Sequence, residues 1–306
     1  MQRRNFIKNT MLATGALSLP LTQNNLFAEN AMNIMNIPQN TNNFKKSIMW
    51  GTVGVEGTVL DKCRAIKEAG FQGIEPDSHM NRQEVLDAVK TTGLEISDVC
   101  CSTHWRKQLS DPDAAVRQEA VEEIIVALED AHAYGTDAIL LVPGVVNENV
   151  NYDECWERSV DGIKKLIPVA ERLKVMICVE NVWNNFLMSP IEANKYIDQF
   201  DSPYVKFYFD CGNILIYGWP EQWIRIMGAR TGRIHIKEFS KQNANSIGLR
   251  AGFNASLTEG DVNWAKVMDS ARKYYKNVWL TTEQGSSRTI DELKNLNERF
   301  DKILNM

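Results

Sequence analysis

Four ionisable side chains stand at or near the ends of apolar runs in the second half of this 306-residue sequence. They are Glu180, Asp210, His235 and Glu283. Three carboxylates and one imidazole form an oxygen-rich set that suits Mn²⁺, Mg²⁺, Co²⁺ or Zn²⁺. Carboxylates buried together without a cation are costly, because like charges at close range cannot all ionise. The set therefore predicts a divalent metal ion, although each residue alone could be an ion pair or a helix cap.

Short apolar runs alternate regularly with longer amphipathic runs along the sequence. This pattern predicts the strands and helices that hold the four side chains. Continuously apolar runs such as 138–142 are typical of parallel strands that are covered on both faces. We expect eight strands, over residues 47–53, 73–75, 95–101, 138–142, 175–180, 205–210, 233–237 and 278–283. We expect eight helices, over residues 58–69, 81–91, 113–134, 153–173, 190–200, 219–227, 262–275 and 289–304.

Alternating strands and helices predict an α/β fold with a parallel sheet. Eight units of roughly 32 residues are typical of a (β/α)8 TIM barrel, which we place over residues 47–306 as a single domain. A doubly wound open sheet is the alternative, but no Gly-x-Gly-x-x-Gly follows the first strand. In a TIM barrel the chemistry lies at the carboxyl ends of the strands. The four ionisable side chains should therefore meet at one rim.

Residues 1–28 predict an export signal. A basic start that contains Arg3-Arg4, a short apolar stretch and a small residue at a cleavage point make up this pattern. The start resembles a twin-arginine signal, although Gln2 stands where Ser or Thr is usual, and an ordinary secretory signal is the alternative. Residues 29–46 are Asn-rich and predict a flexible linker. We therefore expect an exported, periplasmic protein.

The composition argues against several classes of partner. A formal net charge of -5 disfavours binding to nucleic acid, which needs a basic surface. No segment after the leader reaches the roughly 18 apolar residues of a membrane span. The six cysteines show no Cys-x-x-Cys spacing, so we expect them to be mainly small buried side chains.

Several motifs resemble the xylose isomerase-like TIM-barrel family, and within it the sugar phosphate isomerase/epimerase group. They are Glu180-Asn181-x-Trp183, Phe209-Asp210-Cys211-Gly212-Asn213, Ile234-His235-Ile236-Lys237-Glu238-Phe239, Glu259-Gly260-Asp261 and Thr282-Glu283. Relatives in this group include ketose 3-epimerases and hydroxypyruvate isomerase. The resemblance implies that Glu180, Asp210, His235 and Glu283 hold one divalent metal ion. It also implies that Glu180 and Glu283 lie on opposite faces of the substrate as the catalytic acid/base pair.

Two positions depart from the pattern of the family's 3-epimerases. Asn213 stands where a substrate-contacting His commonly follows the metal-binding Asp. Lys241 stands where an Arg commonly follows the metal-binding His. Asn donates a hydrogen bond but no proton at pH 7, and Lys is a point charge without the planar fork of Arg. We expect both residues to contact substrate, and the departures leave its identity open.

Five further residues are candidate substrate contacts. Glu75 and His104 lie at or after the ends of the second and third predicted strands. Alternatively, Glu75 could form an ion pair with a neighbouring Lys or Arg, and His104 could be a structural residue. Trp183 could form an apolar wall against a sugar ring or pack in the core. Lys237 lies two residues beyond His235 and so faces the same side of a regular strand. Glu259 begins a segment that could close over the pocket.

The reaction that these residues support is removal of a proton next to a carbonyl group. The resulting enediolate carries negative charge that a chelated metal ion stabilises. Return of the proton from the other face epimerises the carbon, and its return to the neighbouring carbon interconverts aldose and ketose. Phosphorylated sugars are chiefly intracellular. If the protein is exported, we therefore expect its small-molecule substrate to be a non-phosphorylated sugar or keto-sugar.

Other functions remain open at this point. The same proton abstraction followed by loss of the glycosidic group would make the protein a 3-keto-glycoside lyase or hydrolase. A non-catalytic carbohydrate-binding barrel is an alternative from another class, and it would hold no metal. Related DNA-repair endonucleases gather more His ligands than this acidic chain, with four His in total, provides. The oligomeric state is also open, with a homodimer as one alternative.

Overall fold

The computed structural model describes residues 44–285 and 287–306. The predicted export signal and all but the end of the predicted linker lie outside these residues. Strand β1 (Lys45–Met49) begins inside the segment assigned to the linker. Lys46 is buried there, and its ammonium group pairs with Asp301 of the last helix. This ion pair connects the first strand to the end of the chain.

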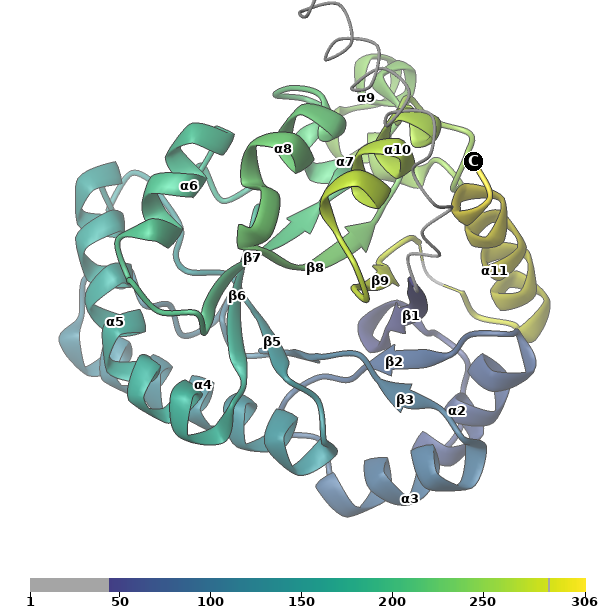
Figure 1. Cartoon of the computed structure of the whole chain (residues 1–306), viewed down its shortest axis with the longest axis horizontal. Helices are drawn as coiled ribbons and strands as arrows, with labels where there is room; N and C mark the ends of the chain where they lie inside the picture. The colour runs from purple at the N-terminus through teal and green to yellow at the C-terminus, as the bar shows by residue number, and fades with distance from the viewer. Residues whose placement is uncertain (1–43, 286) are drawn as a thin grey trace, which may run out of the picture. The chain divides into compact units, whose positions relative to one another are not determined.

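Nine short parallel strands form one sheet in the described part of the chain, in the order β3-β2-β1-β9-β8-β7-β6-β5-β4. After β1 these are β2 (Gly73–Glu75), β3 (Glu95–Ile96), β4 (Val99–Cys100), β5 (Ala138–Leu141), β6 (Met176–Glu180), β7 (Val205–Asp210), β8 (Thr231–Ile236) and β9 (Trp279–Thr282). Strands β3 and β4 are two pieces of the predicted third strand. Because they are consecutive in the chain, the two ends of the sheet meet and form a nearly closed barrel (Figure 1). The predicted TIM barrel is confirmed.

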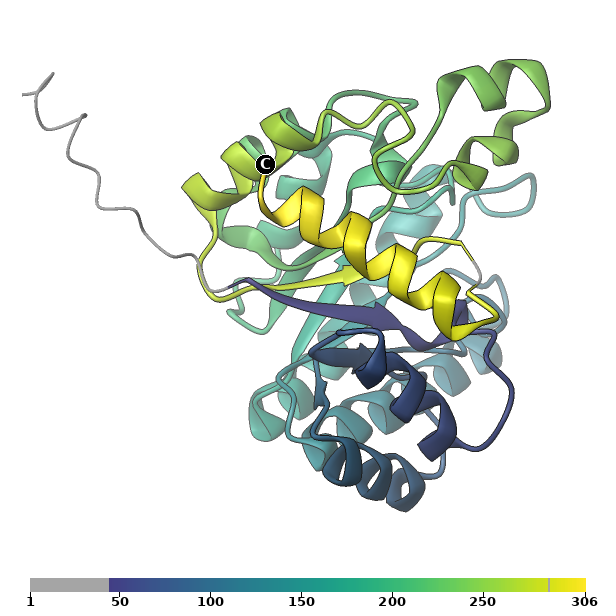
Figure 2. The same ribbon diagram turned by 90° about the vertical axis from the view of Figure 1, so that its right-hand side faces the viewer.

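The helices surround the strands as an outer ring (Figure 1). The eight predicted helices are α2 (Val59–Glu68), α3 (Arg82–Thr92), α4 (Ala114–Tyr134), α5 (Tyr152–Leu173), α6 (Pro190–Asp198), α8 (Pro220–Met227), α10 (Trp264–Tyr274) and α11 (Ile290–Leu304). Short helices not expected from the sequence are α7 (Cys211–Ile214), α9 (Lys241–Ser246), η1 (Trp50–Thr52), η2 (Gly228–Arg230) and η3 (Leu249–Asn254). Figure 2 shows α9 and η3 projecting beside the carboxyl ends of the strands, on the side where α11 begins.

Local side chains set the starts of two helices that border this face. Ser189 Oγ accepts a hydrogen bond from the Glu192 amide at 3.2 Å, at the start of α6. At the start of α11, Thr289 and Glu292 form a capping box, in which each side chain accepts from the backbone amide of the other residue. Such caps satisfy amides that have no partner within the helix.

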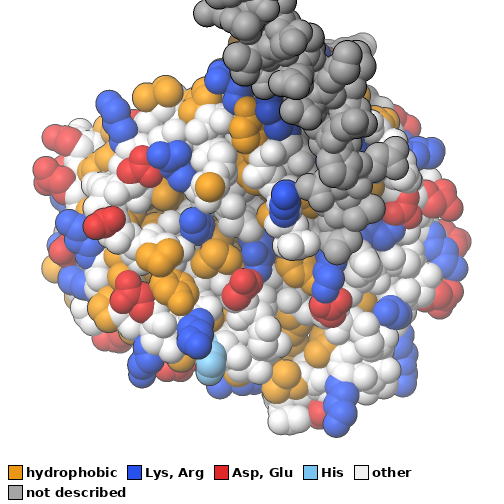
Figure 3. All heavy atoms as spheres, in the orientation of Figure 1, with side chains coloured by type: hydrophobic (Ala, Val, Ile, Leu, Met, Phe, Trp, Pro, Cys, Tyr) orange, Lys and Arg blue, Asp and Glu red, His pale blue; other side chains and the backbone are white. Residues whose placement is uncertain are grey.

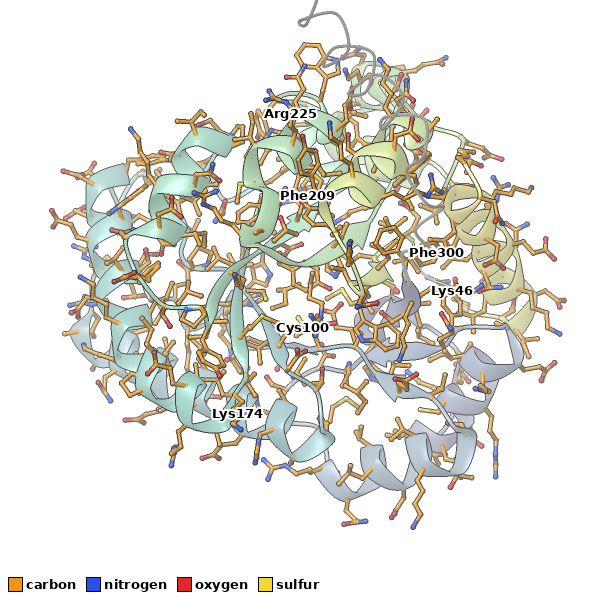
Figure 4. The ribbon with its side chains drawn as sticks, in the orientation of Figure 1. Lys46, Cys100, Lys174, Phe209, Arg225 and Phe300 are labelled. Carbon is orange, nitrogen blue, oxygen red and sulfur yellow. The ribbon has the colours of Figure 1, made fainter. Side chains whose placement is uncertain are left out.

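The core has two parts. The larger part fills the space between sheet and helices, where Phe300 of α11 packs (Figure 4). The smaller part lies among the strands and contains Cys100, Leu140, Cys178 and Tyr208. All six cysteines are buried and unpaired, as the sequence predicts.

The surface carries both signs of charge. Figure 3 shows basic and acidic side chains interspersed with apolar and uncharged atoms on the face it presents. Within residues 44–285 and 287–306, every helix is too short or too polar to cross a bilayer.

Candidate metal centre

The four ionisable residues at the carboxyl ends of β6 to β9 converge in the structure. Glu180 ends β6, Asp210 ends β7, His235 lies in β8, and Glu283 directly follows β9. One ligand atom from each lies within 4.8 Å of the corresponding atoms of the other three. Glu283 is the most accessible, with 24% of its side chain exposed. The predicted convergence at one rim is therefore present.

His235 and Lys237 provide the positive charge within this cluster. His235 Nδ1 lies 3.0 Å from Glu180 Oε1 and 3.2 Å from Glu283 Oε2. The ammonium group of Lys237 donates to Glu283 Oε2 at 2.9 Å and lies 3.7 Å from Asp210 Oδ2. Two cationic side chains thus face three carboxylates.

The hydrogen bonding of the two Asp210 carboxylate oxygens indicates whether the cluster fits a metal ion. Its Oδ1 accepts a hydrogen bond from the Asn213 amide at 2.7 Å. Its Oδ2 is buried and has no hydrogen-bond partner among the described residues. A buried carboxylate oxygen without a donor is costly, and a cation would satisfy it. Because the other donors are two carboxylates and an imidazole, the set fits Mn²⁺, Mg²⁺, Co²⁺ or Zn²⁺.

The electrostatics of the cluster point the same way. Burial raises the pKa of Asp210 to about 7, and it also raises the pKa of Glu180. Burial acts to raise the pKa of Glu283 as well, but the charge of Lys237 and the bond from His235 outweigh it and lower that pKa. The deeper carboxylates therefore lack sufficient positive charge around them, which a divalent cation would supply.

Glu75, which the sequence analysis predicts as a substrate contact, lies beneath the cluster. Its side chain is 0% exposed, and its Oε2 lies 2.9 Å from His235 Nε2. The Tyr208 hydroxyl donates to the same oxygen at 3.2 Å. Because Nε2 faces Glu75, the other ring nitrogen of His235 faces the carboxylates of the cluster. A carboxylate in this position orients the ring of a metal-binding His.

The carboxylates around His235 favour the protonated form of its ring. Burial acts to lower its pKa, but Glu75, Glu180 and Glu283 together outweigh burial and raise the pKa well above its ordinary value. In that form both ring nitrogens carry protons, and a metal ion held by Nδ1 would replace one of them. Metal binding at such a site releases a proton.

His104 is buried and neutral. Only 4% of the residue is exposed, and its Nδ1 accepts a hydrogen bond from the Val142 amide at 3.3 Å. Burial lowers its pKa to about 3, and Glu283 acts weakly in the opposite direction. The proton of the neutral ring must lie on Nε2, because Nδ1 is an acceptor. Nδ1 of His104 therefore has a structural role. Nε2 is a hydrogen-bond donor that has no partner among the described residues.

Trp183, Asn213 and Lys237 form one wall beside the cluster. The Trp183 indole donates to the Asn213 carbonyl at 3.1 Å. The Asn213 side-chain amide donates to the Asn181 carbonyl at 2.9 Å, so this nitrogen is already committed to holding the loop. Phe253 of η3 completes the wall, since its ring centroid lies 4.7 Å from that of Trp183 and 4.7 Å from Lys237 Nζ.

Lys241 and Glu259, which the sequence analysis predicts as substrate contacts, lie outside the cluster. Lys241 is exposed at the start of α9, and its backbone amide donates to Asp261. Glu259 is exposed and pairs with Arg299 of α11 at 2.7 Å. Both residues belong to the segment that follows β8 and extends outward from the barrel. They therefore lie away from His235, although they are close to it in the sequence.

Two residues that the sequence analysis did not select organise this segment. Buried Glu238 accepts hydrogen bonds from Val262 and Trp264, at 3.0 and 2.7 Å. Phe253 lies in a stretch without strand or helix periodicity, so no local signal could have placed its ring over Lys237. Glu238 lies two residues after the end of β8, and this position near a strand end was the signal available in the sequence.

Comparison with known proteins agrees with this architecture. The sequence model described as xylose isomerase-like TIM barrel matches residues 63–303. L-ribulose-5-phosphate 3-epimerase UlaE of Salmonella paratyphi A is 27% identical over 195 residues, which are 58% of this chain and 68% of that protein. UlaE of Escherichia coli O1:K1 / APEC is 26% identical over 168 residues, 51% of this chain and 59% of that protein. The match therefore spans only about three fifths of the latter relative.

Solved structures show the same fold at lower identity. The 3-keto-D-glucoside 4-epimerase YcjR from E. coli superposes with a TM-score of 0.72 at 18% identity, covering 86% of this chain and 100% of that one. An L-ribulose 3-epimerase superposes with a TM-score of 0.69 at 15% identity, covering 86% and 95%. These similarities establish the barrel, and the function has to be argued from the site.

Proposed function

The chain belongs to the xylose isomerase-like TIM barrel family, and on that premise we propose that it is a metal-dependent sugar epimerase or isomerase. One observation carries the proposal. Glu180, Asp210, His235 and Glu283 meet within 4.8 Å of one another, and a buried oxygen of Asp210 lacks a partner among the described residues. This arrangement is costly by itself and becomes favourable around a cation.

These four residues would hold the metal ion. When bound, a divalent cation supplies Lewis-acid stabilisation of the negative charge that develops on the substrate next to the deprotonated carbon. His235 contributes Nδ1, and Glu75 holds the opposite side of its ring. Lys237 lies between Asp210 and Glu283, where it can donate to an oxygen of either carboxylate.

Glu180 and Glu283 are the proposed acid/base pair. They come from β6 and β9, the outer two of four adjacent strands, and the residues of β7 and β8 lie between them. One carboxylate can therefore take a proton from one face of a sugar while the other returns a proton to the opposite face. Positioned acid/base groups of this kind supply about 10² to 10⁴ in rate.

The substrate that we propose is a non-phosphorylated sugar or keto-sugar. The export signal predicted over residues 1–28 motivates this choice, and a periplasmic location forms part of the same proposal. Curated relatives include L-ribulose-5-phosphate 3-epimerase, and structural neighbours include a 3-keto-D-glucoside 4-epimerase. A 3-keto-glycoside lyase would begin with the same proton abstraction and differs only in its products.

The test combines metal analysis with proton exchange. Purified protein should contain about one divalent ion per chain, and it should catalyse exchange of the proton next to the carbonyl of ketoses or 3-keto-glycosides in deuterated water, followed by NMR. Chelation should abolish exchange, and Mn²⁺, Mg²⁺, Co²⁺ or Zn²⁺ should restore it. Exchange that is unchanged after complete removal of metal would refute the proposal. Release of the aglycone would assign the lyase reaction.

A further inference from the structure

A cleft beside the metal centre points to the substrate class. We propose that this cleft binds an uncharged, hydroxyl-rich second unit of a glycoside, while the reacting ring lies at the metal centre. This inference rests on the proposed function and makes its substrate more specific. The cleft has a volume of about 550 Å³ and lies between η3 and the first turns of α11. Its lining includes Phe253, Asn254, Gly285, Asp291, Asn295 and Leu296.

The cleft adjoins the reacting centre. Gly285 lines it and stands two residues after Glu283, so their Cα atoms lie within about 8 Å of each other. Phe253 also lines the cleft, and the same ring contacts Lys237 and Trp183 in the wall of the metal centre. A volume of 550 Å³ lies within the usual range of about 300 to 1,000 Å³ for small-molecule sites. Because the cleft and the metal centre share Phe253 and the segment that follows Glu283, the proposal places the second unit of a glycoside in the cleft when the first unit is at the metal centre.

One side of the cleft is held in place by Gln284, whose side chain is buried. Its amide nitrogen donates to the carbonyls of Phe253 and Ala255 at 2.8 and 2.7 Å. Its amide oxygen accepts from the Glu238 amide at 2.5 Å. These bonds connect the end of β9 directly to η3, so the cleft is a built feature of the fold.

The charges of the cleft exclude a phosphate group. In TIM barrels, phosphate often binds near the loops after the last two strands and at a helix N-terminus, where free amides attract it. Here the Glu292 carboxylate already accepts from the amides of Arg288 and Thr289, at 2.5 and 3.1 Å. Asp291 adds a second negative charge at the same helix start.

Arg299, which also lines the cleft, does not reverse this charge. Arg299 donates to the Leu257 carbonyl at 3.0 Å and pairs with Glu259 at 2.7 Å. Its guanidinium is therefore already neutralised, and a bound anion would face the carboxylates of Asp291 and Glu292 without compensation. A sugar phosphate is the wrong ligand for this cleft, whereas a neutral polyol meets no such repulsion.

The remaining lining suits a sugar. Phe253 offers an aromatic surface, and Leu257 and Leu296 add apolar floor. The side chains of Asn254 and Asp291 make no hydrogen bond to another described residue, so their donors and acceptors are available. An apolar ring face beside amide and carboxylate groups matches a pyranose, which has apolar C–H faces and equatorial hydroxyls.

The test compares substrates that differ only in the second unit. Metal-loaded protein is assayed for proton exchange with the 3-keto forms of methyl α-glucoside and maltose, and of methyl β-glucoside and cellobiose. We expect at least a tenfold higher kcat/KM for one keto-disaccharide than for its methyl glycoside. This ratio should fall at least fivefold in Asn254→Ala and Asp291→Ala. Asp269→Ala, on the exposed surface of α10, is the matched control and should keep the ratio.

A binding measurement separates this inference from the proposed function. Calorimetric titration with maltose, cellobiose, methyl glucosides and ribulose 5-phosphate should show tightest binding of a disaccharide, weakened at least fivefold by Asp291→Ala. Disaccharide binding without proton exchange would support the cleft and refute the proposed reaction. Proton exchange with equal kcat/KM for disaccharide and methyl glycoside, or tightest binding of ribulose 5-phosphate, would refute the cleft. Absence of both exchange and disaccharide binding would refute both.

Discussion

The two halves of the barrel rim differ in what their strands present. Strands β6 to β9 place Glu180, Asp210, His235 and Glu283 within 4.8 Å of one another. In the half formed by β1 to β5, the corresponding side chains are withdrawn from the mouth or kept neutral. Glu75 lies under His235, and the ring of His104 has a pKa of about 3.

This contrast indicates that a compact metal site takes its ligands from adjacent strands. Neighbouring strands lie about 4.8 Å apart, so four strands in a row can bring four side chains to one ion. Among the described residues, the opposite half of the rim contributes no member of this four-residue set, and it supports the site instead. Glu75 does so through a single hydrogen bond to the far side of the His235 ring.

The largest effect should come from the ligand half. Glu180→Gln and Glu283→Gln keep the shape of each side chain but remove its ability to exchange a proton, and each should lower kcat about 10³-fold or more. NMR-detected proton exchange in deuterated water measures this loss. Glu298→Gln, on the exposed face of α11, is the matched control and should leave kcat unchanged. Retained turnover in both active-site variants would contradict the acid/base assignment.

The supporting half should act through metal affinity. Glu75→Leu removes the partner of His235 Nε2, and we expect the Kd for Mn²⁺ to rise about 10- to 100-fold. Glu75→Gln should recover part of the affinity, because its amide oxygen still accepts the Nε2 proton. Calorimetric titration of the metal-free protein gives the Kd, and circular dichroism verifies folding. Tyr208→Phe removes only the other bond to Glu75 and should have a smaller effect. If folded Glu75→Leu bound Mn²⁺ with the same Kd as the wild type, Glu75 would not support metal binding through His235.

His104 should give the pH dependence of stability that a buried neutral imidazole produces. Its pKa is about 3 when folded and near 6.5 when unfolded, so the unfolded state binds more protons between these values. Its contribution is fully present above pH 6.5 and is lost as the pH falls, by about 1.4 kcal/mol per pH unit. Urea unfolding at pH 7, 6 and 5 should show a shallower loss in His104→Asn than in the wild type. His132→Asn, on the surface of α4, should follow the wild type. Parallel curves for His104→Asn and wild type would contradict the buried neutral state.

The smallest effect should come from outside both halves. Lys241→Ala removes an exposed side chain on α9, and surface substitutions usually change free energies by less than about 0.5 kcal/mol. We expect kcat/KM to change less than about twofold. Lys237→Ala is the matched comparison and should lower kcat/KM much more, because Lys237 bonds Glu283. A tenfold loss in Lys241→Ala would mean that α9 moves over the metal centre.

Most of the fold could be predicted because its signals are local. Apolar runs of strand length and amphipathic runs of helix length indicate the elements, and a polar residue at the end of such a run indicates the rim. The break between β3 and β4 and the helices α9 and η3 could not be predicted this way. Residues 238–261 carry no periodicity, and their shape depends on Glu238 and Gln284, whose partners are distant in sequence.

Short-range sequence patterns are sufficient to predict the barrel and the four converging residues, since strand order and side-chain alternation follow from them. The surroundings of the other candidate residues depend on contacts between distant parts of the chain. Glu75 lies 160 positions from His235 in the chain, and Glu259 turns outward to Arg299. Such partners are chosen by three-dimensional packing, in which burial makes each polar atom take whichever donor, acceptor or ion lies within reach, at any distance along the chain.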